Sequence, residues 1–196
     1  MTAKTRLFLY ALRVTLALGC STPAEESAAP SGPCPLGDAS STAKTEMTIV
    51  ARTPDGRLAP LAEGDALSLI EPPQGGQVVF VGVRAKNLDG CGVLVTASLR
   101  DATSGRLIGI ESRPIDLVKA ADGFGETPSP GDITTFANVP VCPNRDAVRA
   151  LSGLPYQLDV SLRDREGRTA QASISVVPTC SEQVLCPCEC GAAACR

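Results

Sequence analysis

The chain has no histidine. This absence removes the most common general base, the most common zinc ligand and every Ser-His or Cys-His nucleophile pair. Tryptophan is also absent, and with four Phe and two Tyr there is no aromatic cluster of the kind that dominates protein interfaces. These absences argue against hydrolase chemistry and predict a protein that is not an enzyme.

The sequence also lacks any cluster of lysine and arginine. If residues 1–19 are removed as a signal, as argued below, 15 basic and 21 acidic residues are left, a net charge of −6. A chain of this charge is not expected to bind nucleic acid. No cofactor is predicted either.

The N-terminus has the parts of a secretory signal. A basic start with Lys4 and Arg6 precedes an apolar run over 7–18, and Gly19 and Cys20 follow. The run is too short to span a bilayer. An ordinary secretory signal with an incidental cysteine is one interpretation of this pattern, and a plain N-terminal helix is another.

The end of this segment, Leu16-Ala17-Leu18-Gly19-Cys20, resembles the lipobox of bacterial lipoproteins. In that family the cysteine is diacylated and the chain is cleaved just before it. The resemblance implies a signal peptide over 1–19, lipidation of Cys20 and attachment to a membrane. Because Ser21 rather than Asp follows the cysteine, it also implies sorting to the cell outer membrane of a Gram-negative envelope, facing either side.

The composition divides the rest of the chain into three parts. Residues 20–44 are rich in Ser, Thr, Pro, Ala, Glu and Gly without apolar periodicity, which predicts a flexible, disordered tether. Residues 45–180 predict one domain, and residues 181–196 form a cysteine-rich tail. Cys34 lies within the tether, so a disulfide there would pin the tether to the domain.

The strongest secondary-structure signal is a β-hairpin over 156–176. Apolar residues alternate with polar ones on both sides of the turn Asp164-Arg165-Glu166-Gly167, which places one set on a core face and the other in water. Further short strands are predicted at 47–51, 66–70, 78–85, 93–99, 107–110, 115–118 and 133–141. The segment 78–85 is apolar on both faces and is therefore expected to be covered on both. The Gly- and Pro-rich segment 122–131 predicts a solvated loop.

The order of these elements over 46–178 resembles a bacterial immunoglobulin-like β-sandwich, an all-β fold of about seven short strands. The resemblance rests on the strand pattern and on the final hairpin, which begins at Tyr156. Tyr156 is either a tyrosine corner, with its hydroxyl bonded to upstream backbone, or a core tyrosine at the boundary of the domain.

Eight cysteines remain once Cys20 is assigned to lipid. An even number in an exported chain predicts a disulfide framework; the candidates are Cys34, Cys91, Cys142, Cys180, Cys186, Cys188, Cys190 and Cys195. In the sandwich that the chain resembles, the loop before the last hairpin and the end of its second strand lie together, which implies a Cys142–Cys180 pair. The same topology implies a Cys34–Cys91 pair.

The tail cysteines have three alternative roles. Cys186, Cys188, Cys190 and Cys195 could bind zinc or a soft copper ion as four thiolates. They lack the Cys-x-x-Cys spacing of common zinc sites, so two local disulfides are favoured. A Cys-x-Cys redox pair is the third alternative, but no Lys or His lies beside it to lower a thiol pKa.

Three functional hypotheses follow. The leading one is a non-enzymatic, lipid-anchored envelope module that binds a protein or another envelope component through its edges and loops. The second is a metal-binding or redox lipoprotein that acts through the tail. The third is a carboxylate enzyme using Glu111, Asp116 or Asp122, although the spacing selects no pair among them.

Overall fold

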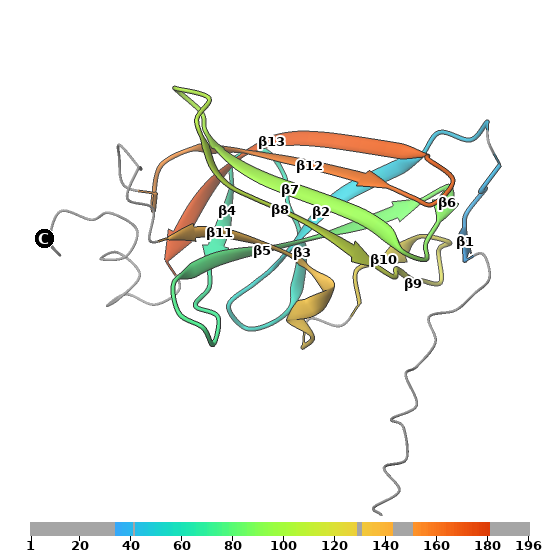
Figure 1. The fold of residues 1–196 in the computed structure, drawn as a ribbon, viewed down its shortest axis with the longest axis horizontal. Coiled ribbons are helices and arrows are strands. Elements are labelled where there is room, and N and C mark those ends of the chain that lie inside the picture. The colour runs from blue at the N-terminus through green and yellow to red at the C-terminus, as the bar shows by residue number, and fades with distance from the viewer. Residues whose placement is uncertain (1–33, 41, 129–130, 143–150, 181–196) are drawn as a thin grey trace, which may run out of the picture. The chain divides into compact units, whose positions relative to one another are not determined.

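The computed structural model describes residues 34–40, 42–128, 131–142 and 151–180. Within these ranges the chain is all-β, and the one departure from strand and turn is a single 3₁₀ turn, η1 (Ile133–Thr135). The all-β prediction is therefore confirmed (Figure 1).

Sheet I contains six strands in the order β3-β2-β5-β10-β9, with β11 pairing with β5 beside β10. Its strands are β2 (Glu46–Arg52), β3 (Leu58–Pro60), β5 (Gln77–Lys86), β9 (Val118–Lys119), β10 (Gly125–Glu126) and β11 (Ala137–Cys142). Every pairing in it is antiparallel.

Sheet II has the order β4-β13-β12-β7-β8. Its strands are β4 (Asp65–Leu69), β7 (Val93–Asp101), β8 (Leu107–Ile115), β12 (Tyr156–Arg163) and β13 (Thr169–Cys180). Only β4 and β13 run parallel. A small third sheet pairs β1 (Pro35–Leu36) with β6 (Leu88–Asp89).

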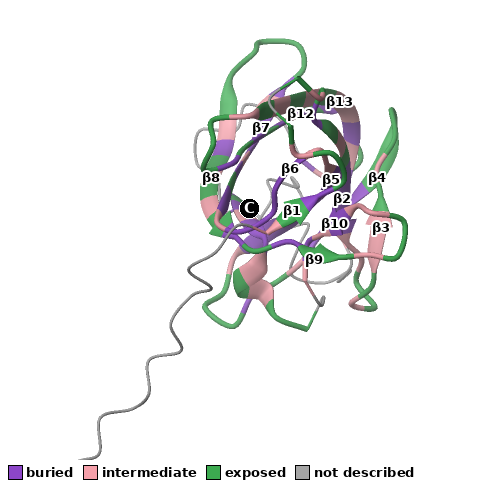
Figure 2. Cartoon of the chain, turned by 90° about the vertical axis from the view of Figure 1, so that its right-hand side faces the viewer, coloured by how far each residue is buried: buried purple, intermediate pink, exposed green. Residues whose placement is uncertain are grey.

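The predicted hairpin is β12 and β13, paired without interruption from Tyr156↔Val176 to Arg163↔Thr169. Its apolar positions on β12 are buried and its polar ones are exposed or partly so, because successive side chains of a strand point to opposite faces. The inner faces of sheets I and II share one core, to which sheet I contributes mainly Val and Ala side chains and sheet II mainly Val and Leu. Figure 2 shows these buried segments along the inside of the fold.

The doubly apolar strand is β5, and it is covered on both faces as predicted. Val79, Val81 and Val83 lie in the main core. On the other face Phe80 packs edge-on against Phe136, with ring centroids 6.1 Å apart, in a second cluster. Both phenylalanines are essentially inaccessible to solvent, which explains why this strand has no polar face.

The structure differs from the sequence prediction at the end of the tether and within the predicted loop 122–131. Residues 34–40, placed in the tether on composition, carry β1, and Leu36 is buried in the main core. Within the predicted loop 122–131, Gly125 and Glu126 form β10 and pair with β5. Both pieces are two-residue strands, too short to show the alternation by which strands are recognised in a sequence. For the same reason the thirteen strands of the described chain exceed the nine segments predicted as strands and the roughly seven strands of the fold that the chain resembles.

One long side of the fold is closed where β8 meets β11. Glu111 of β8 accepts a hydrogen bond from the Asn138 backbone N–H, and Arg113 donates to the Thr134 carbonyl at 3.1 Å. Gly109 makes the approach possible, since a Cβ there would lie 1.9 Å from the Pro140 carbonyl oxygen. Glycine is therefore required at this position for steric reasons.

Gly109→Ala is expected to lower the free energy of unfolding by about 3 kcal/mol, because backbone has to move to accept the methyl group. Urea denaturation of the variant measures the loss. Ile110→Ala on the same strand is the control: its side chain is 50% exposed, and its effect should stay within about 0.5 kcal/mol. Equal stability of Gly109→Ala and the native chain would contradict the close approach of the two strands.

Candidate functional site

The N-terminal entry to the domain is fixed by the disulfide between Cys34 and Cys91, the pairing expected from the strand order. The two Cα atoms are 5.4 Å apart, within the usual range for a disulfide. Directly after Cys34, β1 pairs with β6, so that Pro35 lies opposite Asp89. A chain entering from the N-terminus is thus joined to the domain both covalently and by backbone hydrogen bonds.

Asp89 holds this disulfide in place. Its carboxylate accepts the backbone N–H of Cys34 at 2.9 Å and that of Cys91 at 3.1 Å, and the residue is 6% exposed. Possible metal-ligand atoms of the three residues lie within 4.8 Å of one another. Both sulfur atoms are consumed in the disulfide, however, and metals are bound by thiolates. The cluster is therefore a structural one.

A second buried carboxylate, Asp164, joins the hairpin turn to the same end of the fold. It accepts the backbone N–H of Asp89 at 2.9 Å, and from Arg168 both the backbone N–H at 2.8 Å and the guanidinium Nε–H at 2.6 Å. The Arg168 guanidinium also donates to the Ala39 carbonyl. Burial opposes ionisation of Asp164, yet these donors together hold the pKa of its carboxyl below the usual value.

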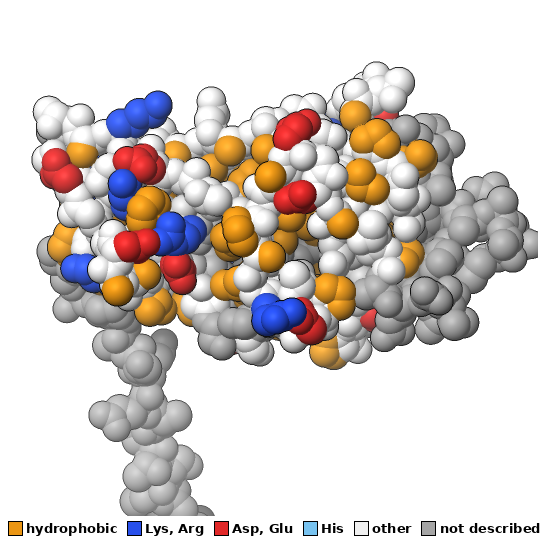
Figure 3. Space-filling model, turned by 180° about the vertical axis from the view of Figure 1, so that it is seen from behind, with side chains coloured by type: hydrophobic (Ala, Val, Ile, Leu, Met, Phe, Trp, Pro, Cys, Tyr) orange, Lys and Arg blue, Asp and Glu red, His pale blue; other side chains and the backbone are white. Residues whose placement is uncertain are grey.

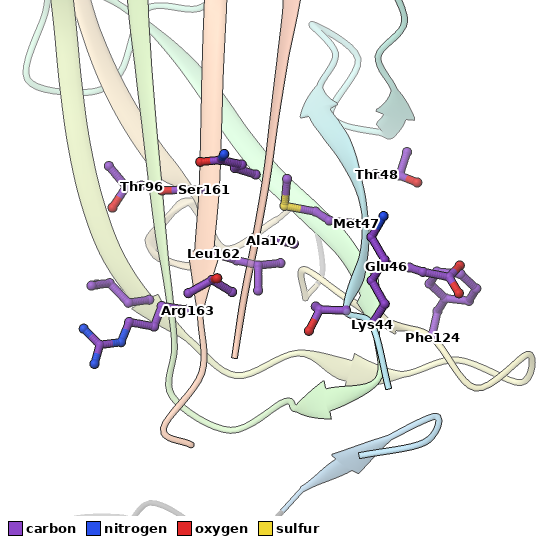
Figure 4. Close-up of a pocket in the computed structure, with 14 residues that line it drawn as sticks. Lys44, Glu46, Met47, Thr48, Thr96, Phe124, Ser161, Leu162, Arg163 and Ala170 are labelled. Carbon is purple, nitrogen blue, oxygen red and sulfur yellow. The ribbon is translucent and has the colours of Figure 1, made fainter. Parts of the chain in front are cut away.

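A groove of about 1120 Å³ is lined by residues of β2, β7, β12 and β13. Figure 4 shows Met47, Leu162 and Ala170 lying together in it, from three different strands. Its remaining lining is mostly polar: Lys44, Thr45, Glu46, Thr48, Leu94, Thr96, Phe124, Ser161, Arg163, Thr169 and Gln171.

The groove has binding chemistry but no catalytic pair. Its single carboxylate, Glu46, forms an ion pair with Lys86 at 3.1 Å. The hydroxyl groups that line it have no adjacent histidine to activate them, because the chain contains none. Apolar side chains with backbone and hydroxyl groups around them suit recognition of another polypeptide.

An exposed ion network borders the groove. Arg84 lies over the ring of Phe124 at 4.1 Å and pairs with Glu126 at 2.7 Å and with Asp122, while the Lys86 ammonium lies 4.8 Å from the same ring. The Phe124 backbone N–H lowers the pKa of Asp122. Figure 3 shows charged side chains of both signs gathered toward one end of the rear face. Exposed pairs of this kind contribute little to stability.

The three carboxylates considered for catalysis each have a separate structural contact. Glu111 pairs with Arg113 at 2.5 Å, Asp116 accepts the Gly92 N–H at 2.6 Å, and Asp122 belongs to the ion network. None of these contacts joins two of the three carboxylates to each other. The geometry therefore gives no support to an acid and base pair among them.

The other predicted cysteines divide into two groups. Cys142 and Cys180 are each disulfide-bonded, and their pairing with one another stays a prediction. Cys20 and the tail residues Cys186, Cys188, Cys190 and Cys195 lie outside the described residues. The metal, redox and local-disulfide interpretations of the tail stay predictions as well.

Sequence reasoning missed the buried network of Asp89, Asp164 and Arg168. Asp164 and Gly167 were identified as turn residues, but nothing local in a sequence tells a buried aspartate from a solvated one. The available signal was Arg168 four residues after Asp164, a spacing that lets the two side chains meet across the turn.

No protein-family model matches the chain, and a search of curated proteins finds no relative. Among the residues that the structure describes, no helix is long and apolar enough to cross a membrane.

Proposed function

We propose that this protein is a non-enzymatic, lipid-anchored module of the bacterial cell envelope, carried by an immunoglobulin-like β-sandwich that binds a protein or another envelope component. The anchor is a diacyl group on Cys20, and the membrane is the outer membrane. The observation that carries the proposal is the covalent joint between the N-terminal segment and the domain at Cys34–Cys91.

The joint has a mechanical consequence for an anchored protein. Cys34 lies fourteen residues after Cys20, so the free tether ends there rather than at residue 44. A flexible segment of that length spans roughly 20 Å on average. The domain therefore stays close to the lipid surface, and a pull on the anchor acts on the disulfide and on β1.

The strand order supports the immunoglobulin-like assignment. In such folds two antiparallel sheets face each other, and consecutive strands cross between them. Here β2, β5 and β11 belong to sheet I, whereas β7, β8, β12 and β13 belong to sheet II, so the chain crosses from β5 to β7 and from β8 through β11 to β12. The parallel β4–β13 pair places an early strand beside the last one.

The proposal is tested by intact-mass analysis of protein extracted from the membrane fraction. We expect a chain that begins at Cys20 and carries the mass of a diacylglycerol group. The control is Cys20→Ser, which cannot be lipidated and is expected in the soluble fraction with its fold unchanged. An unmodified native chain, or a chain cleaved at another position, would overturn the anchor.

A further inference from the structure

The outer face of sheet II carries a second cavity, of about 550 Å³, which lies across β7, β12 and β13. Its volume is within the range that is usual for small-molecule binding sites. The polar residues that line it are Thr96, Ser98, Asp159, Ser161, Gln171 and Ser173. Three of them also line the groove described above, so the cavity and the groove adjoin.

The register of the three strands brings these short side chains together. Ser98 of β7 lies opposite Asp159 of β12, and Asp159 lies opposite Ser173 of β13. The next row has the same order across the strands: Thr96, Ser161 and Gln171. Figure 4 shows the first two members of this row next to each other. Polar groups from three strands therefore face one space.

Ser98 has a buried hydroxyl group without a partner in the described part of the chain. The residue is 6% exposed and lines the cavity. Its neighbours Ala97 and Leu99 lie in the main core, so the Ser98 side chain points outward, to the cavity. No hydrogen bond joins its hydroxyl group to another described residue. Because buried polar groups in proteins are rarely left unpaired, this hydroxyl requires a group that enters the cavity from outside.

Asp159 is held in a fixed orientation beside Ser98. Its carboxylate accepts hydrogen bonds from the Ser173 hydroxyl at 2.7 Å and from the Gln157 side-chain amide at 3.1 Å. The Arg100 Nε–H donates to it at 3.2 Å, and this ion pair balances the charge of the carboxylate. Asp159 is the one charged residue among the described residues that line the cavity, so the cavity suits an uncharged ligand.

We propose that this cavity binds a neutral saccharide, whose hydroxyl groups pair with the side chains of Ser98, Ser161 and Gln171. The side chains of Ser161 and Gln171 are exposed and form no hydrogen bond with another described residue. A serine hydroxyl and a glutamine amide can each donate and accept a hydrogen bond. A saccharide carries several hydroxyl groups close together, and each of them also donates and accepts. The ligand and the lining are therefore complementary without any charge.

The lining argues against a peptide as the ligand. The backbone of β12 pairs with β7 on one side and with β13 on the other, so the floor of the cavity offers no backbone hydrogen bonds to an added strand. Two apolar residues, Val160 and Ala172, also line the cavity, but both pack into the main core. An apolar side chain of a peptide would thus find no pocket here.

One end of the cavity lies at an edge of the sheet. No described strand pairs with the outer edge of β13 over 169–174, the segment that contains Gln171 and Ser173. This free edge leaves that end of the cavity without a closing strand, so that one unit of a longer saccharide chain can occupy it. The inference deepens the proposed binding function, on which it rests, because it names the chemical class of the bound component.

The test uses the full chain carrying Cys20→Ser and follows its backbone amides by NMR during titration with uncharged probes. The probes are glucose, N-acetylglucosamine, the trisaccharide of each, and triglycine. We expect a saccharide, and not triglycine, to shift the amide signals of residues 96–98, 159–161 and 171–173. Because no aromatic ring lines the cavity, we expect dissociation constants of about 1 to 10 mM. Tighter binding of a trisaccharide than of its single sugar identifies a polysaccharide as the source, and equal binding identifies a free sugar.

Three substitutions locate the binding. Ser98→Ala removes the buried hydroxyl and should weaken saccharide binding about three- to ten-fold, the effect of one neutral hydrogen bond. Ser161→Leu, at an exposed position, fills the cavity and should abolish the shifts. Ser175→Ala is the matched control for Ser98→Ala: it removes a hydroxyl from the same outer face but outside the cavity, and binding should be unchanged.

Signals that stay in place up to about 50 mM saccharide would overturn the proposal. Equal binding by Ser161→Leu and the native chain would place the saccharide elsewhere and overturn it too. Shifts of the same amides by triglycine alone would make the ligand a peptide, and equal losses in Ser98→Ala and Ser175→Ala would remove the role of the buried hydroxyl. A negative titration leaves the mass test of the Cys20 anchor unaffected, so the two proposals fail separately.

Discussion

Cys34→Ser combined with Cys91→Ser is expected to lower the free energy of unfolding by about 4 kcal/mol. The disulfide closes a loop of 57 residues, and in the chain-entropy account a cross-link of that span removes this much conformational freedom from the unfolded chain. The double substitution avoids leaving one unpaired thiol. Thermal and urea unfolding of the variant and the native chain measure the difference.

The disulfide variant also separates two roles of this end of the fold. Asp89 keeps its backbone donors at residues 34 and 91 in the variant, so the domain should still fold, with residues 34–40 exchanging their amide hydrogens faster than in the native chain. The native chain under reducing conditions should show the same change. Unaltered stability and unaltered exchange in the variant would contradict the disulfide as the joint between tether and domain.

Asp164→Ala is expected to cost about 3 to 5 kcal/mol. The Asp164 side chain is fully buried and the Arg168 side chain is 15% exposed, so the substitution leaves a largely buried guanidinium without its counter-ion. The backbone N–H groups of Asp89 and Arg168 lose their acceptor at the same time. Urea denaturation at neutral pH measures the loss.

The control for Asp164→Ala is Asp55→Ala, which removes an exposed carboxylate paired with Arg57 at 2.5 Å. Exposed ion pairs are worth under about 1 kcal/mol, so this variant should unfold almost like the native chain. Equal losses in the two variants would show that burial of Asp164 has no energetic consequence.

A second substitution, Asp164→Asn, tests how the contribution of this carboxylate to stability depends on pH. Because the pKa of this carboxyl is lower in the folded chain, its ionised form stabilises the fold above the unfolded value of about 3.9. That stability is lost as the pH falls through the folded pKa. The difference in unfolding free energy between the native chain and Asp164→Asn should therefore be constant at neutral pH and shrink below about pH 4. A difference independent of pH would contradict the charged network.

The longer strands could be predicted because the alternation or the unbroken run of apolar residues in the sequence shows which of their faces are buried. The hairpin β12–β13 follows from strict alternation around Asp164 and Gly167, and β5 follows from an unbroken apolar run. The short strands could not be predicted, since two paired residues contain no period. β10 forms because β5 provides a partner for Gly125 and Glu126, and the paired residues Ala85 and Arg84 lie 40 and 42 positions earlier in the sequence.

The residues of the candidate site also fall into a group that the sequence could predict and a group that it could not. The Cys34–Cys91 pair was accessible once a strand order was assumed, because that order determines which loops lie together. The buried role of Asp164 was not accessible, since the donors of its hydrogen bonds include Asp89, 75 residues away. The free edge of β13 was also hidden, because a strand's sequence does not state on how many sides it is paired.

The sequence by itself determined the all-β class, the central hairpin, the doubly covered strand and the lack of histidine chemistry, since each depends on residue type and local period. Tertiary structure alone decided that residues 34–40 belong to the domain, that two aspartates are buried at one end, and that no described strand pairs with one edge of β13 over 169–174. These features depend on contacts between segments far apart in the sequence, and such contacts produce no local periodic pattern of apolar residues.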